Sequence, residues 1–495
     1  MESLLHAVIA RLPLGQGFLQ TLQQALDPQL LDDLFEQHRG TGSEQKVTFT
    51  FLVEWIGNAL VNHRGSGRQA LQELAALELL PACQAAIYGK LRRVPVELSQ
   101  ALVAATAQRL QQLLPTALNA TTLGSVPPSL KDHRVLIVDG KKLKNLPKRS
   151  RSLQGLRGKL LGGKVVAGFC LNDGLVTHLE ATLDGEANDA PLTPGLIAQS
   201  CASHPSESLL FVADRQFCDL KIPNMILEKG QHFVIRQNRK TGFHPENSVV
   251  LCDSPQRTVH DSVGWLGSPK DQRRLRVRQI MLQQANTEDV LIVTSLLDAE
   301  RYPAEDLLSL YKCRWQIEQV FQQLHEVFEQ ETYVGSSPSG AVFQFAMCVL
   351  LYNVVHVLRV LIAEQKQMAP RRISTKMLFV SLQRELKALS VFVPTDLWGR
   401  MFAKVPPAQL RRALGPLLLQ SWSALWIKCV EHKPRRPPVE RRVSGNHASA
   451  QKLILQHRAA KNQALREAKA QREAQYQAEV AARKAAALPP TPSIC

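Results

Sequence analysis

Two short apolar runs that each end in an aspartate constrain the fold of this chain more than any other feature of its sequence. Residues 135–139 read VLIVD, and residues 209–214 read LLFVAD. A continuous apolar run of this length is typical of a strand buried on both faces, inside a sheet that helices cover. Sites in open sheets are built at the carboxyl ends of such strands. An aspartate there is equally well explained as the cap of a turn or of the following helix.

Strand and helix patterns alternate around these two runs. GKVVAGFCLND and LVTHLEATLD predict two strands around the turn NDG, and NDAPLTPGLIAQSCA predicts a helix. The stretch from HFVIRQN to VLIVTSLL is rich in predicted strands, and helical patterns return from residue 303 to about residue 365. The sequence therefore predicts an α/β fold.

An apolar segment at residues 341–363, AVFQFAMCVLLYNVVHVLRVLIA, is long enough to span a bilayer. Asn353, His356 and Arg359 recur in it at a spacing of three residues, which places them on one side of a helix. An arginine inside a membrane-spanning helix is costly. We therefore expect a buried helix with one polar edge, and a membrane protein is the alternative.

The charge of the chain is strongly positive. Its 495 residues carry a formal net charge of +17, and the pI is about 9.6. This balance indicates a polyanionic partner, either nucleic acid or an anionic membrane surface. Residues 431–495 hold 13 Lys and Arg against 5 Glu, a net charge of +8. Nine cysteines without a C-x-x-C pair indicate neither a zinc site nor a disulfide framework, and they favour a reducing compartment.

A stripe of polar residues runs along LYKCRWQIEQVFQQLHEVFEQ, residues 310–330. Tyr311, Arg314, Glu318 and His325 stand at offsets of 0, 3, 7 and 14 residues. At about 100° per residue these offsets fall within roughly 60° of one another around a helix. An ordinary solvated face with one Arg–Glu ion pair explains the stripe most simply. A functional site on this helix therefore requires partners from elsewhere in the chain.

Asp139, Asp214 and Glu318 form an acidic set with gaps of 75 and 104 residues. Converging carboxylates repel one another, because two unit charges about 4 Å apart cost on the order of 4 kcal/mol at an effective dielectric constant of about 20. Hard divalent cations relieve this repulsion, and Mg²⁺ or Mn²⁺ prefers oxygen ligands. Two such ions about 3.5–4 Å apart activate a nucleophile and stabilise the leaving oxygen of a phosphodiester.

Basic residues lie beside every member of this acidic set, after both aspartates and one helical turn before the glutamate. They are Lys141, Lys142, Arg215 and Arg314. A charge run is usually a solvated face. Basic residues next to each carboxylate instead suggest a phosphate backbone that passes over the acidic set.

The helix carries a more specific pattern. Tyr, two residues, Arg, three residues, Glu, six residues and Lys form the signature of the DDE transposases of the insertion sequence four family. The chain resembles this family, because Tyr311, Arg314 and Glu318 stand in register with the signature, and His325 takes the place of the Lys. VLIVDG and FVADRQF resemble the strands that bear its two aspartates. The resemblance covers about residues 126–365.

The resemblance implies an RNase H-like fold, with a mixed sheet flanked by helices. It implies two Mg²⁺ ions, for which Mn²⁺ substitutes, held by Asp139, Asp214 and Glu318, with Asp139 bridging the ions. The implied reaction is cut-and-paste movement of a DNA element. Hydrolysis of one strand exposes a 3′-OH, which is joined to target DNA by transesterification. The implied partners are double-stranded DNA and a second copy in a synaptic homodimer, in the cytoplasm at the nucleoid of a prokaryote.

The resemblance also assigns DNA contacts to seven residues: Tyr311, Arg314, His325, Lys141, Lys142, Arg215 and Trp265. Tyr311 and Arg314 would hold phosphates of the element end, and the lysines with Arg215 would line the DNA path. His325 departs from the pattern, because the charge of a histidine near pH 7 depends on its surroundings. Trp265 would stack on a flipped base, although a lone Trp in a strand is more often part of a core.

Composition and resemblance together divide the chain into six segments. These are an N-terminal helical module that contributes to end-DNA binding (1–125), the first part of the catalytic domain (126–229), a β-strand-rich insertion (230–298), the second part of the catalytic domain with the Glu helix (299–365), a C-terminal helical region (366–430) and a basic, partly disordered, helical tail (431–495).

Two other functions are compatible with the same residues. A catalytically silent, sequence-specific DNA-binding descendant would keep the basic surface without needing the carboxylates. A structure-specific nuclease on the same fold would cut DNA without joining it.

Overall fold

The computed structural model describes residues 9–40, 46–115, 126–149, 160–238, 240–254, 256–285, 288–392 and 405–428, with a few residues between 463 and 472. The chain divides into two compact units. The larger unit is Met1–Gln154 with Lys159–Cys429, and the smaller unit is Gly155–Gly158 with Val430–Cys495. Every element discussed below belongs to the larger unit unless we say otherwise.

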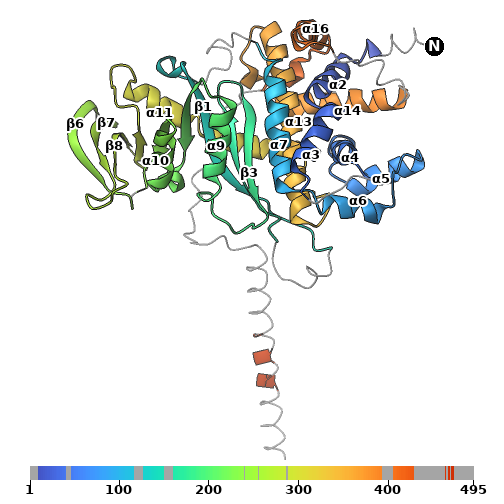
Figure 1. The fold of residues 1–495 in the computed structure, drawn as a ribbon, viewed down its shortest axis with the longest axis horizontal. Helices are drawn as coiled ribbons and strands as arrows, with labels where there is room; N and C mark the ends of the chain where they lie inside the picture. The colour runs from blue at the N-terminus through green and yellow to red at the C-terminus, as the bar shows by residue number, and fades with distance from the viewer. Residues whose placement is uncertain are drawn as a thin grey trace, which may run out of the picture. The chain divides into compact units, whose positions relative to one another are not determined.

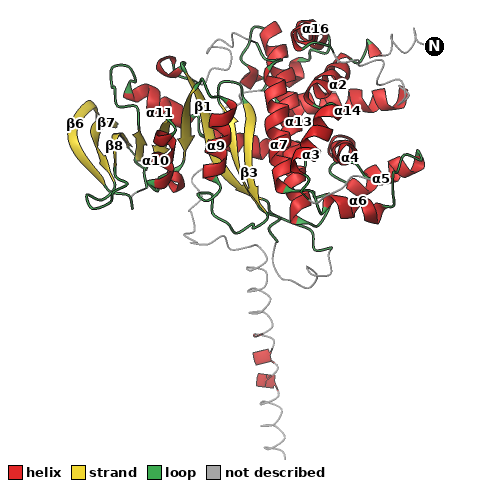
Figure 2. Cartoon of the chain, viewed as in Figure 1, coloured by secondary structure: helices red, strands yellow, loops and turns green. Residues whose placement is uncertain are grey.

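A mixed sheet of nine strands runs through the larger unit (Figures 1 and 2). Its spatial order is β3-β2-β1-β4-β5-β9-β8-β7-β6. Strand β4 pairs with β1 and β5 in parallel, and the other neighbours are antiparallel. The strands are β1 (His133–Lys142), β2 (Lys164–Cys170), β3 (Leu175–Thr182), β4 (Ser208–Ala213), β5 (His232–Arg236), β6 (Phe243–Ser254), β7 (Arg257–Leu266), β8 (Leu275–Gln284) and β9 (Val290–Thr294).

Helices cover both faces of this sheet, so the fold is a mixed α/β fold. The helices before β1 are α2 (Pro13–Ala25), α3 (Pro28–His38), α4 (Phe49–Asn62), α5 (Gly67–Ala76), α6 (Gln84–Leu91) and α7 (Val96–Gln111). Those after β3 are α9 (Thr193–Ser203), α10 (Lys221–Glu228), α11 (Ala304–Lys312), α12 (Trp315–Glu326), α13 (Pro338–Gln365), α14 (Thr375–Phe392) and α16 (Pro407–Leu419). Short 3-10 turns occur at Pro128–Leu130, Arg215–Phe217, Pro370–Arg372 and Ala424–Trp426.

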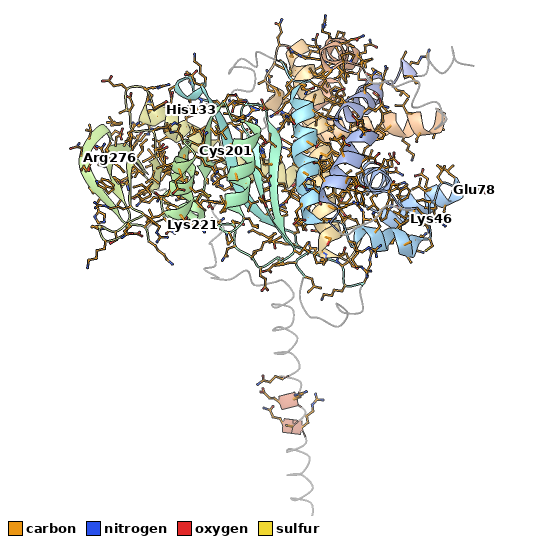
Figure 3. All side chains as sticks on the ribbon, viewed as in Figure 1. Lys46, Glu78, His133, Cys201, Lys221 and Arg276 are labelled. Carbon is orange, nitrogen blue, oxygen red and sulfur yellow. The ribbon has the colours of Figure 1, made fainter. Side chains whose placement is uncertain are left out.

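Alternate side chains of β1 enter two different hydrophobic cores, as expected for a strand buried on both faces. Val135 and Ile137 belong to a large cluster that includes α7, α12 and α13. Leu136 and Val138 belong to a smaller cluster with α9 and α10. Figure 3 labels His133, the first residue of β1, which lies at the opposite end of the strand from the predicted catalytic aspartate.

The apolar segment 341–363 is the middle of α13, and it is a core helix. This helix alone, among the described residues, is long and apolar enough to cross a membrane, and its apolar window is completely buried by the rest of the protein. In Figure 1 it lies beside α7, and it contacts α7, β3 and α16. Burial by protein on all sides explains the continuous apolar sequence, so the expectation of a buried helix is confirmed.

The polar edge of α13 holds the backbone at one end of the sheet. Asn353 accepts a hydrogen bond from Val176 N at 3.0 Å and donates one to Val176 O at 2.8 Å. His356 Nε2 lies 2.9 Å from the carbonyl oxygen of Asp173. Because β3 is an edge strand, Asn353 satisfies backbone groups that no neighbouring strand reaches.

Three parts of the structure differ from the sequence-based expectation or extend it. The predicted continuous helix through residues 310–330 is interrupted between α11 and α12, at Cys313 and Arg314. The strands of segment 230–298 do not form a separate sheet, because β6 to β8 extend the main sheet through β9. The predicted tail, 431–495, lies almost wholly outside the described residues.

Replacement of Asn353 by Ala should destabilise the protein, because it leaves the buried amide and carbonyl of Val176 without partners. We expect the free energy of unfolding to fall by about 2–4 kcal/mol. A lower melting temperature in scanning calorimetry would reveal this loss. Asn62→Ala, on the exposed surface of α4, is the control and should leave the melting temperature almost unchanged. Equal melting temperatures for both variants would contradict the assigned role of Asn353.

Candidate active site

The parallel pairing of β1 with β4 brings the two predicted aspartates together. In this register Val138 faces Ala213, and the next residues on the two strands are Asp139 and Asp214. Side chains alternate along a strand, so both aspartates point to the same face as Ile137 and Val212. That face packs against the large core, to which α11 and α12 also belong.

Asp139 is a buried carboxylate on β1. The residue is 9% exposed, and its Oδ1 accepts a hydrogen bond from Gly140 N at 2.9 Å. Burial raises the pKa of the Asp139 carboxyl to about 7, and the negative charges of Asp214 and Glu318 act in the same direction. The Gly140 amide and the positive charge of Arg314 oppose this rise. The charges of both other carboxylates act on Asp139, so the three side chains lie in one region of the fold.

Arg314 supplies positive charge among the carboxylates. Its Nη2 lies 2.8 Å from Glu318 Oε1, and its Nη1 lies 3.9 Å from Asp139 Oδ2. The Arg314 residue is only 8% exposed, and its Nε atom has no hydrogen-bond partner among the described residues. A buried cation between two acidic side chains offsets part of their mutual repulsion.

The interruption between α11 and α12 gives this arginine its position. Arg314 has helical backbone angles and stands immediately before the first residue of α12, one turn from Glu318. Tyr311, near the end of α11, is buried, and burial raises the pKa of its phenol. The charges of Arg314 and Asp214 also act on this phenol. Tyr311 therefore lies with the acidic set and not on a solvated face.

Asp214 has a second role that the sequence also suggested. Its side chain accepts a hydrogen bond from Gln216 N at 2.9 Å and caps the short turn Arg215–Phe217. Arg215 is exposed in that turn. It lines an open cavity of about 400 Å³ together with Arg236 and Lys240.

The remaining predicted DNA contacts fall into different surroundings. Lys141 is partly buried and donates to Phe321 O at 3.4 Å, whereas Lys142 is exposed. His325 is exposed on α12, and its Nδ1 lies 3.9 Å from Glu331 Oε1. Trp265 is partly exposed, donates to Glu246 Oε1 at 2.6 Å, and has the guanidinium of Arg274 over its ring. Trp265 is thus held by polar partners on its own sheet and is not a core residue.

A buried ion pair beside the site is absent from the sequence-based prediction. Asp189 pairs with Lys164, and both side chains are almost completely buried. A Cβ built on Gly140 would lie 2.1 Å from Asp189 Oδ1, so the carboxylate fills the space next to the residue that follows Asp139. Only the absence of a side chain at Gly140 permits this contact. The sequence gives one signal, an Asp at the start of the helix predicted over NDAPLTPGLIAQSCA, and that signal is not specific.

The donor set suits a hard divalent cation in its chemistry. It offers three carboxylates from β1, the end of β4 and α12, and two of them raise the pKa of the third. Among the described residues, however, no group of three or more His, Cys, Asp or Glu side chains is arranged closely enough to hold a metal ion. Arg314 occupies the space between Asp139 and Glu318 in this arrangement.

Comparison with known proteins gives a match over the same region. Residues 130–354 match the family described as "Transposase DDE domain". The match supports a DDE transposase domain. It begins before β1 and ends within α13, and it contains Asp139, Asp214 and Glu318.

Individual relatives are distant. The chain is 24% identical over 197 residues to the "Probable transposase for insertion sequence element IS5377" of Geobacillus stearothermophilus, across 39% of this chain and 52% of that protein. The chain therefore spans about half the length of this relative. Among solved structures, the piggyBac transposase synaptic complex with hairpin DNA has 11% sequence identity and a TM-score of 0.35. That match covers 78% of this chain and 80% of the other. A likeness this weak carries no argument.

The buried charge of Asp139 predicts a pH-dependent stability in metal-free buffer. Its folded-state pKa lies above its ordinary value of 3.8, so folding favours the neutral carboxyl. The stability that the neutral carboxyl contributes is fully present below pH 3.8 and is lost as the pH rises through about 7. Asp139→Asn mimics the neutral form. We expect the variant to be more stable than the wild type by about 2–4 kcal/mol above pH 7, with the difference vanishing near pH 4.

Thermal unfolding with EDTA between pH 4 and pH 8.5 measures this difference. Asp184→Asn, in the exposed turn after β3, is the matched control and should follow the wild type throughout. A wild type that stays as stable as Asp139→Asn above pH 7 would show that Asp139 bears no destabilising buried charge.

Proposed function

We propose that this chain is a metal-dependent DNA transposase of an insertion sequence. One observation carries the proposal. Arg314 lies between Asp139 and Glu318, the charge of Asp214 also acts on Asp139, and the three carboxylates lie inside the segment that matches the transposase DDE domain family. The spacing of Tyr311, Arg314 and Glu318 supports the narrower assignment to the insertion sequence four family, with an RNase H-like catalytic fold.

The proposed reaction has two phosphoryl-transfer steps. Water attacks a phosphorus at the element end, and the bond to the 3′ oxygen breaks, which leaves a free 3′-OH. That hydroxyl then attacks a phosphorus of target DNA, and a 3′ oxygen of the target strand leaves. Mg²⁺ bound by the three carboxylates would activate the attacking oxygen and stabilise the leaving one.

The chain's own residues suit these steps in different ways. Asp139 is the most buried of the three proposed catalytic carboxylates. The surrounding protein and the hydrogen bond from Gly140 N fix the position of its side chain. Glu318 is more open to solvent, with 34% of its side chain exposed, so it would be accessible to an approaching ligand. Arg314 neutralises the carboxylates in the free protein and is placed to turn toward a phosphate when cations take over that role.

Double-stranded DNA is the proposed partner, and a homodimer is the proposed synaptic form. The net charge of +17 supports sequence-independent affinity that falls with salt. Lys142 and Arg215 are both exposed beside the proposed catalytic aspartates, so they are accessible to DNA. Lys141 is partly buried and bonded to α12, so it would act by positioning that helix.

The direct test is an activity assay with purified protein, DNA that carries the flanking ends of its own gene, and Mg²⁺ or Mn²⁺. We expect metal-dependent nicking at the ends and joining to target DNA. Asp214→Ala and Glu318→Ala should each lower both activities by at least about 10³-fold, because the carboxylates act as a unit.

The control variant is Glu326→Ala, which removes an exposed carboxylate two turns further along α12. It should retain activity near that of the wild type. Cleavage without joining would identify a nuclease instead. Specific binding to the ends without cleavage in either metal would identify a silent DNA-binding protein. Activity that survives both Asp214→Ala and Glu318→Ala would overturn the assignment of the site.

A further inference from the structure

A cationic cavity lies where the helices before β1 meet the start of α13. Its volume is about 360 Å³. Residues from α5, from α6 and its carboxyl end, from the segment after β1, and from the loop that enters α13 line it. The lining residues with polar side chains used below are Arg68, Arg92, Arg149, Tyr88 and Ser336. None of these residues belongs to the catalytic set.

The positive charge of this cavity is uncompensated by the residues that line it. Arg68, Arg92 and Arg149 come from three separate segments, and no Asp or Glu is among the lining residues. None of the three guanidinium groups forms an ion pair with another described residue. Three like charges around one hollow repel one another, and an anion in the hollow would remove that repulsion. The structure of the free protein therefore leaves this cavity electrostatically suited to an anion.

Hydrogen-bond donors in the cavity favour an oxyanion over a simple halide. The phenol of Tyr88 lines the same cavity as Arg68 and Arg149, and the charges of both arginines lower its pKa against the effect of burial. Ser336 lines the cavity one residue before the N-cap of the 28-residue helix α13. Guanidinium, phenol and hydroxyl donors together match the several acceptor oxygens of a phosphate.

We propose that this cavity binds a phosphate group, and that in the working protein the group is a phosphodiester of the element-end DNA. The DNA part of this inference rests on the proposed function. Arg149 follows Asp139 by ten residues, so the chain between them spans at most about 35 Å. That reach corresponds to about ten base pairs of duplex at roughly 3.4 Å per step. The cavity therefore lies within about one helical turn of DNA from the catalytic site.

This assignment gives the helices before β1 a defined contribution. Arg68 and Arg92 belong to them, whereas Arg149 and Ser336 belong to the segment that matches the transposase domain. A phosphate bound here would be held by both parts at once. Such a contact positions DNA without reading its sequence.

The test compares two pairs of substitutions with the same loss of charge. Arg68→Gln with Arg92→Gln removes two cavity residues. Arg64→Gln with Arg93→Gln removes exposed neighbours that do not line the cavity. All four side chains are exposed, so folding should be preserved, and equal melting temperatures would verify this.

Binding of end DNA is measured in EDTA by fluorescence anisotropy across a range of salt concentrations, so catalysis plays no part. We expect the cavity pair to weaken binding by about tenfold and to lower the salt slope by about one, whereas the control pair changes both values much less. Equal losses for both pairs would overturn the DNA assignment, because the arginines would then act only through net charge.

A second arm titrates inorganic phosphate, with chloride as the reference, and follows the melting temperature. Stabilisation of the wild type but not of the cavity pair supports phosphate chemistry in the cavity, whatever the DNA result. That stabilisation, together with a DNA affinity that the cavity pair leaves unchanged, would identify a free phosphate ligand and reject the phosphodiester.

No effect of the cavity pair in either arm would overturn the whole proposal. A wild type that fails to bind DNA but is stabilised by phosphate would refute the transposase function and the DNA part, and leave the phosphate site standing.

Discussion

The parallel pairing of β1 with β4 is the constraint on which the rest of the site depends. Both strands are buried on both faces, so their register is fixed by two hydrophobic cores at once. In this register Asp139 and Asp214 come directly after a pair of facing residues and point to the same side. A shift of one residue would turn one of them toward the opposite core. The carboxylates are therefore held by apolar packing far more than by their own contacts.

Electrostatics then determines what this arrangement requires. The charges of Asp214 and Glu318 both act on Asp139, and the pKa of Asp139 rises to about 7, chiefly because of its burial. Arg314 offsets part of this repulsion through Glu318 and, at longer range, Asp139. Three carboxylates against one arginine leave excess negative charge, which favours the approach of a cation.

Much of this arrangement was predictable from local patterns. The apolar runs ending at Asp139 and Asp214 predicted two strands, which are β1 and β4, and the three regularly spaced polar residues of 341–363 predicted a buried helix. These predictions succeeded because each depends on neighbours within one element, where backbone periodicity fixes direction. The predicted common helical face of Tyr311, Arg314 and Glu318 is instead divided between α11 and α12.

Other features depend on contacts between distant residues, which no local pattern contains. The Asp189–Lys164 pair packs against Gly140, across about 50 positions of sequence. The interruption at Arg314 breaks a helix whose sequence is regular, and Trp265 is held by Glu246 and Arg274 on its own sheet. Segment 230–298 joins the main sheet because its first strand, β5, pairs in parallel with β4.

The central claim is that Asp139, Asp214 and Glu318 form one divalent-cation site. Its most direct test is the melting temperature of wild type, Asp139→Asn and Glu318→Gln as Mn²⁺ is added without DNA. We predict that Mn²⁺ raises the melting temperature of the wild type and that either substitution removes most of this rise, although the two residues lie on different elements. An equal rise in all three proteins would contradict the claim, because the cation would then bind elsewhere.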